Sequence, residues 1–76
     1  MSKAETILEG LGGFDNIVEI EPCITRLRVQ VNDAALVDDA KLKSAGIFGL
    51  MKSGTAVQVV VGPEADNIAD DIEDLR

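Results

Sequence analysis

Residues 17–31 of this chain read Ile17-Val18-Glu19-Ile20-Glu21-Pro22-Cys23-Ile24-Thr25-Arg26-Leu27-Arg28-Val29-Gln30-Val31. From Thr25 onward apolar and polar side chains alternate, which is typical of a strand with one buried face. Because the apolar set must face the core, Arg26 and Arg28 lie on the opposite face, about 7 Å apart at the rise of a strand. We expect an antiparallel sheet with one face covered by helices and the other exposed to solvent.

A second strand is expected just before it, from Ile17 to Glu21, with Val18 and Ile20 on one face and the glutamates on the other. Pro22 has no amide donor, so it is expected to end or bend this strand. Cys23 therefore falls at the junction between two strands, where side chains are commonly exposed and backbone amides unpaired.

Three helices are expected around these strands. The first follows a capping box, with Ser2 as N-cap and Glu5 three residues later, and ends at Gly12-Gly13. Asp38 is a suitable N-cap for the second helix. Pro63 is suited to the start of the third, whose apolar residues recur at helical spacing.

The remaining strands are expected within residues 48–61, a hairpin whose turn is Ser53-Gly54-Thr55. The simplest arrangement that buries every apolar stripe is an α+β fold of order α-β-β-α-β-β-α. It has four antiparallel strands and three helices packed on one face. The 76 residues are expected to form a single domain, 1–76, with a thin core. We expect a freestanding protein.

Composition excludes several classes of function. The formal net charge of -7 repels nucleic acid and anionic lipid. One cysteine and no histidine cannot build a zinc site, and no calcium-loop or nucleotide-binding motif occurs, so we expect no metal and no cofactor. No apolar run is long enough to span a membrane. A single unpaired cysteine suits a reducing cytoplasm, where we expect the protein to act.

Cys23 is the candidate nucleophile, because the chain has no histidine and no second thiol. A lone cysteine is most often a small buried hydrophobe. Here, however, it stands at a junction between strands with two arginines just beyond it. Nearby arginines lower the pKa of a thiol and favour the reactive thiolate. These features indicate a reactive cysteine.

Arg26 and Arg28 could be solvated charges that pair across the hairpin with Glu19 and Glu21. They could equally clamp a dianion beside the thiol, since guanidinium groups bind phosphate oxygens through paired hydrogen bonds. Thr25 could be a strand former or a hydroxyl donor to the same anion, and free amides in the turn around Ile24 could form an anion nest. Gln58 faces outward by parity and is a further candidate, although such a residue is more often a solvated edge residue than a site group.

Four segments in order carry a family resemblance: Leu11–Ile17, Cys23-Ile24-Thr25-Arg26-Leu27-Arg28, Leu42–Gly49 and Val57–Gly62. The chain resembles the IIB component of the bacterial phosphoenolpyruvate-dependent sugar phosphotransferase system, of the glucose and N-acetylglucosamine type. The resemblance covers nearly the whole chain, and the Cys-Ile-Thr-Arg-Leu-Arg run is highly specific for that family. Pro22 departs from the small residue expected before the cysteine.

The resemblance implies that Cys23 accepts a phosphoryl group from a phosphohistidine on a IIA partner. It implies transfer onward to a sugar, N-acetylglucosamine or glucose, held by the IIC membrane transporter. Arg26 and Arg28 match paired arginines needed mainly for the step to sugar, and Thr25 and Gln58 match positions near the phosphoryl group. We expect a monomer that associates with the membrane through IIC.

Two other functions stay open on the residues alone. A non-catalytic adaptor would bind a partner through the exposed sheet face and would tolerate Cys23→Ser. A thiol redox sensor would need glutathione or a second chain, because this chain has no resolving cysteine.

Overall fold

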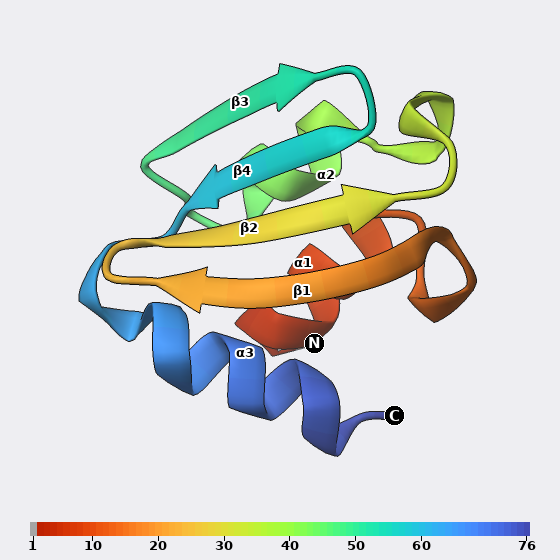
Figure 1. Cartoon of the computed structure of the whole chain (residues 1–76). Coiled ribbons are helices and arrows are strands. Elements are labelled where there is room, and N and C mark those ends of the chain that lie inside the picture. The colour runs from red at the N-terminus through yellow and green to blue at the C-terminus, as the bar shows by residue number, and fades with distance from the viewer. Residues whose placement is uncertain (1) are drawn as a thin grey trace.

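The computed structural model describes residues 2–76. Its helices are α1 (Lys3–Gly10), α2 (Asp39–Ser44) and α3 (Ala65–Asp74), and its strands are β1 (Ile17–Cys23), β2 (Arg26–Val31), β3 (Gly49–Ser53) and β4 (Ala56–Val60). The strands form one antiparallel sheet in the order β1-β2-β4-β3, and the three helices pack on one side of it (Figure 1). The expected α+β fold is confirmed.

Strand β1 is longer than expected, because Pro22 neither ends nor interrupts it. The strand continues to Cys23, and Pro22 lies opposite Leu27 of β2. Proline is tolerated here because β1 is an edge strand, where alternate amides face away from the sheet. The register then places Cys23 opposite Arg26, which leaves only Ile24 and Thr25 in the turn.

A β-bulge at Val18 makes one expectation wrong. The register shifts between Ile17, opposite Val31, and Glu19, opposite Gln30, so Val18 is the extra residue of β1. Its side chain is 61% exposed and does not share a buried face with Ile20. Bulges on edge strands oppose edge-to-edge pairing with other chains, and this one lies at the start of β1.

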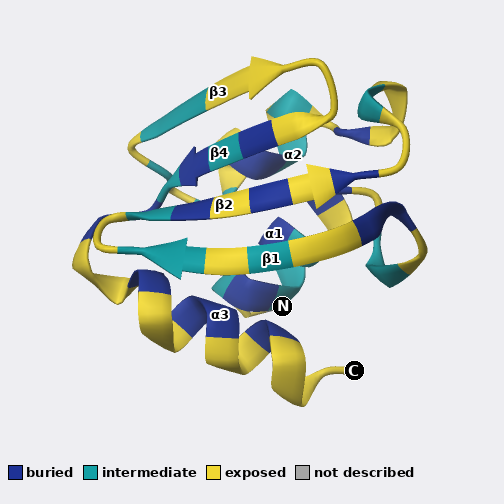
Figure 2. Cartoon of the chain, in the orientation of Figure 1, coloured by how far each residue is buried: buried dark blue, intermediate teal, exposed yellow. Residues whose placement is uncertain are grey.

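The sheet has a helix-covered face and an open face, and the register assigns every strand residue to one of them. Paired residues of antiparallel strands project to the same side. Along β2 buried residues alternate with more exposed ones, as Figure 2 shows. The open face consists of Glu19, Glu21, Cys23, Arg26, Arg28, Gln30, Ala56, Gln58, Val60, Gly49, Met51 and Ser53.

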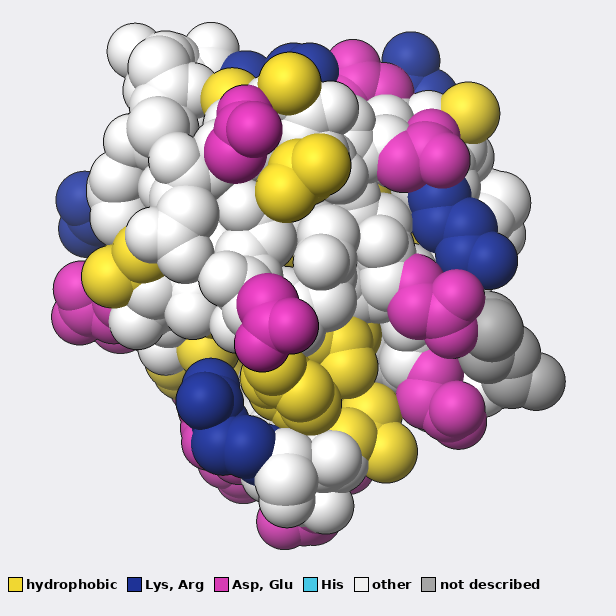
Figure 3. Space-filling model, turned by 90° about the vertical axis from the view of Figure 1, so that its right-hand side faces the viewer, with side chains coloured by type: hydrophobic (Ala, Val, Ile, Leu, Met, Phe, Trp, Pro, Cys, Tyr) yellow, Lys and Arg dark blue, Asp and Glu magenta, His cyan; other side chains and the backbone are white. Residues whose placement is uncertain are grey.

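Charge is distributed unevenly between the open face and the rest of the surface. The charged residues of the open face are two acids, Glu19 and Glu21, and two bases, Arg26 and Arg28, so the face is neutral. The net charge of -7 therefore resides on the other surfaces. On the side of the molecule drawn in Figure 3, acidic side chains are spread over much of the surface.

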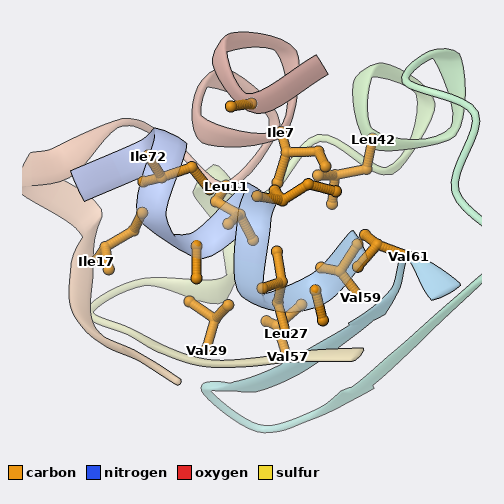
Figure 4. Close-up of a cluster of buried hydrophobic side chains, with 14 of the residues drawn as sticks. Ile7, Leu11, Ile17, Leu27, Val29, Leu42, Val57, Val59, Val61 and Ile72 are labelled. Carbon is orange, nitrogen blue, oxygen red and sulfur yellow. The ribbon is translucent and has the colours of Figure 1, made fainter. Parts of the chain in front are cut away.

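The core fills the space between the sheet and the helices. Its fully buried large side chains are aliphatic and come from both layers (Figure 4): Ile7, Leu11, Leu27, Leu42, Val31, Val57, Val59, Val61 and Ile72. Gly10 allows α1 and α2 to approach closely, because a Cβ atom there would lie 2.8 Å from the Leu42 side chain.

The expected helix starts are confirmed for α1 and α2. Ser2 and Glu5 form a reciprocal capping box, and the Asp38 side chain accepts a hydrogen bond from the Lys41 amide. Pro63 instead lies in a 3-10 turn, Gly62–Glu64, that leads into α3. Within residues 2–76, no helix is both long and apolar enough to cross a membrane.

Candidate functional site

Cys23 is the last residue of β1 and projects to the open face at one end of the sheet. Its thiol is free and the residue is half-buried. Arg26 lies directly opposite it on β2, and Arg28 is the next β2 residue on the same face. The structure therefore brings the predicted nucleophile and both predicted arginines together on one surface.

The turn beside Cys23 has a strained backbone, and hydrogen bonds from residues distant in the sequence hold it in place. Ile24 has a φ of 51°, a left-handed conformation that is unfavourable for a β-branched residue, and its side chain is 87% exposed. The Thr25 carbonyl accepts hydrogen bonds from the amides of Val61 and Gly62, at 3.0 and 2.9 Å. These bonds hold the turn against the end of β4.

Two backbone donors of the turn have no backbone partner. Within residues 2–76 the amides of Ile24 and Thr25 donate to no backbone carbonyl. Unpaired amides in a turn form an anion-binding concavity. The turn thus offers two amide donors directly after Cys23 in the chain.

The two arginines differ in their surroundings. Arg26 is half-buried, and its Nε atom is buried without a hydrogen-bond partner in the described chain. Arg28 is exposed. Among residues 2–76 neither arginine forms an ion pair within 4 Å, so the cross-strand pairs considered with Glu19 and Glu21 are not formed.

Gln58 of β4 lies opposite Arg28 of β2, so Glu21, Arg28 and Gln58 form a row across three strands. Its Oε1 atom is buried and has no hydrogen-bond partner within the described residues. An open groove of about 200 Å³ runs next to this row, lined by Glu19, Glu21, Arg28, Val29, Gln30, Ala56, Val57 and Gln58. Polar side chains without partners beside a groove are available to a ligand or partner.

Sequence reasoning missed the support that Gly62 and Phe48 give to this end of the sheet. Gly62 has a φ of 81°, and a Cβ atom there would lie 2.8 Å from the Phe48 ring. Phe48 itself is 75% exposed. The signal available was a glycine directly after a run of valines, and a turn was the simplest interpretation of it.

This arrangement suits a covalently bound dianion on the cysteine. The groups of this surface that can donate to a phosphoryl group on Sγ are Arg26, opposite Cys23 across the strand pair, Arg28 on the diagonal, and the turn amides. The hairpin holds the turn amides in place, so these donors need little reorganisation when charge develops.

Comparison with known proteins gives a consistent result. Residues 5–38 match the model of the family described as phosphotransferase system, EIIB. The chain is 65% identical over 74 residues to the N-acetylglucosamine-specific EIIB component of the PTS system of Streptomyces coelicolor, covering 97% of this chain and 96% of that protein.

Two further relatives are longer proteins. The chain is 46% identical over 74 residues to the alpha-glucoside-specific EIICB component of Leptotrichia buccalis. The matched region covers 96% of this chain but only 14% of that protein. A crystal structure of one domain of the PTS system IIabc component from Clostridium difficile has a TM-score of 0.78 and 27% identity. The structural match covers 95% of this chain and 76% of the chain in that crystal structure.

Proposed function

Since this chain belongs to the EIIB family of the phosphotransferase system, we propose that Cys23 is the residue that carries its phosphoryl group. EIIB components are phosphotransferases that relay phosphate towards a sugar. The observation that supports Cys23 is its position opposite Arg26 and beside Arg28 on the open face. It is also the only cysteine in a chain without histidine.

In the first step the Cys23 thiolate attacks the phosphorus of a phosphohistidine on a IIA partner. The S–P bond forms as the P–N bond breaks, and the electron pair leaves on the imidazole nitrogen, which takes up a proton. Thiolates are good nucleophiles, and neutralising the phosphoryl oxygens lowers the barrier to such a transfer. Arg26 and the amides of Ile24 and Thr25 are the groups placed to do so.

In the second step a sugar hydroxyl attacks the phosphocysteine. The O–P bond forms, the S–P bond breaks, and the thiolate is regenerated as the leaving group. We assign the base that takes up the hydroxyl proton to the IIC partner that holds the sugar. We assign Arg26, Arg28 and Gln58 to positioning the phosphoryl group for this transfer, by charge and by hydrogen bonding.

The relatives support a IIC partner and a choice of sugar. The EIICB relative carries an EIIC component in the same chain, which supports IIC as the membrane partner here. The relative with 65% identity is named for N-acetylglucosamine, which we propose as the sugar, with glucose as the alternative. Residues 1–76 would act as a single, monomeric phosphotransfer domain at the cytoplasmic surface, bound to IIC and charged by IIA.

Intact mass spectrometry tests the proposal. The protein is incubated with phosphoenolpyruvate, the general phosphotransfer proteins and a IIA partner, beside the Cys23→Ser variant. The wild type should gain one phosphoryl group and the variant none, and N-acetylglucosamine with IIC membranes should remove it. If the wild type gains nothing while IIA is verified as phosphorylated, the relay is overturned and a binding role is favoured.

A further inference from the structure

Glu21 lies directly opposite Arg28 in the register of β1 and β2, on the open face. Opposed side chains of an antiparallel pair have Cβ atoms about 5 Å apart, so the carboxylate is within reach of the guanidinium. No ion pair within 4 Å joins them in this structure, and both side chains line the same groove. The Arg28 guanidinium therefore has no ion-pair partner within residues 2–76, although the Glu21 carboxylate opposite it can accept hydrogen bonds.

The two arginines differ in their freedom to move. Arg26 is half-buried, with its Nε atom enclosed directly opposite Cys23. Arg28 is exposed and lies one step further along β2. Its Cβ atom is a diagonal neighbour of Cys23, about 7 Å away, a distance that a long side chain can span. Arg28 can thus extend towards either Cys23 or Glu21, while the Arg26 side chain, with its buried Nε, is more confined.

The charges on the open face favour movement of the Arg28 side chain between Glu21 and Cys23. Two carboxylates and two guanidinium groups balance while Cys23 carries no phosphoryl group. A phosphoryl dianion on Cys23 adds two negative charges beside Glu21, on the same face of the same strand. Arg28 would then be drawn towards the dianion, and Glu21 would compete for it.

We propose that Glu21 is a positioning residue that competes with Cys23, first as the thiolate and then as the phosphocysteine, for the Arg28 guanidinium. The inference rests on the proposed role of Cys23 as the phosphoryl carrier. Competition limits the stabilisation that Arg28 gives to the thiolate and to the transfer of the phosphoryl group. A surface cross-strand charge pair changes such an equilibrium by about two- to five-fold.

Alkylation of Cys23 by iodoacetamide at pH 7 tests this without any phosphotransfer protein. In Glu21→Gln, Arg28 is free to stabilise the thiolate, so alkylation should be about two- to five-fold faster than in the wild type. Glu19→Gln is the matched control, because it removes the same charge from the same strand but faces Gln30. Its alkylation rate should change less than that of Glu21→Gln.

A double-mutant cycle with Arg28→Gln separates an effect through Arg28 from direct repulsion between Glu21 and the thiolate. If Glu21 acts through Arg28, adding Glu21→Gln to Arg28→Gln should change the rate no more than Glu19→Gln does. Glu21→Asp should restore the wild-type rate. An equal acceleration with and without Arg28, no acceleration by Glu21→Gln, or an equal effect of Glu19→Gln would each overturn the proposal.

Single-turnover transfer from phosphorylated protein to N-acetylglucosamine in IIC membranes gives the second measurement. Glu21→Gln should transfer the phosphoryl group about two- to five-fold faster than the wild type, because Arg28 then acts on it without competition. An unchanged or slower transfer would contradict the competition. Failure of the wild type to become phosphorylated would instead overturn the proposed function, and the alkylation result would stand independently.

Discussion

Ile24, directly after Cys23, has a backbone conformation that lowers the stability of the fold. A β-branched residue at a φ of 51° costs about 1–2 kcal/mol, and an 87% exposed side chain contributes little packing in return. The Thr25 carbonyl, bonded to the Val61 and Gly62 amides, holds the turn in this shape. Strain of this kind is found most often at functional sites.

Replacing Ile24 with glycine should therefore stabilise the protein. Glycine adopts a positive φ without strain but loses more backbone entropy on folding, so a net gain of about 0.5–1 kcal/mol in the free energy of unfolding is expected. Urea denaturation measures it. Ile24→Ala is the matched control, since it removes the exposed side chain but keeps the strain. Glycine being no more stable than alanine would contradict this account.

The arginines should affect the second phosphoryl transfer more than the first. Each charge-assisted hydrogen bond to a phosphoryl oxygen contributes about 1.5–3 kcal/mol, so Arg28→Gln should slow transfer to the sugar roughly 10- to 100-fold. Phosphorylation of Cys23 by IIA should persist. Both rates can be followed by intact mass. Lys43→Gln, an exposed charge on α2, should leave both unchanged.

Among the elements, the β1–β2 hairpin is held by a buried polar side chain at the end away from its turn, where β1 begins and β2 ends. Asn16 is 2% exposed and is the last residue of the 3-10 turn Phe14–Asn16 that leads into β1. Its Nδ2 donates to the Leu11 and Asp33 carbonyls at 2.8 and 3.1 Å, and its Oδ1 accepts from the Asp33 amide at 2.9 Å. One side chain thus joins the end of α1, the start of β1 and the end of β2.

Asn16→Ala should destabilise the fold by about 2–3 kcal/mol, because it leaves buried backbone groups without partners. The free energy of unfolding in urea measures the effect. Asn67→Ala on the exposed side of α3 is the control and should lie within about 0.5 kcal/mol of the wild type. A small effect of Asn16→Ala would show that water replaces the lost bonds.

At the scale of the whole molecule, one thin core carries the stability of a 76-residue chain. For this length a free energy of unfolding of roughly 4–11 kcal/mol is typical. Leu27 is fully buried at the centre of the core and lies on the same strand as both arginines (Figure 4). The core thus positions the site that lies on the other face of the sheet.

Leu27→Ala should cost about 3 kcal/mol, a large share of that total. Thermal and urea unfolding should both show it. Leu36→Ala, at a residue that is 56% exposed, should change stability by less than about 0.5 kcal/mol. Equal effects of the two substitutions would mean that Leu27 is not central to the core.

Local patterns in the sequence determined the elements of this protein and the face on which its arginines lie. The alternation in β2, the caps at Ser2 and Asp38 and the turn around Gly54 are local signals, and each is confirmed. Two local expectations were wrong: Val18 lies in a bulge and Pro22 lies within a strand. Both depend on β1 being an edge strand, which no local pattern reveals.

Only the tertiary structure decided which distant residues lie beside Arg28 and beside the turn that follows Cys23. The strand order places Gln58 beside Arg28 and brings the Val61 and Gly62 amides to the Thr25 carbonyl. The physical reason is that alternation specifies which face of a strand is buried, whereas the choice of neighbouring strand depends on packing of the whole core. The sequence thus determined the position of the single thiol and of its arginines, and the fold determined the geometry around them.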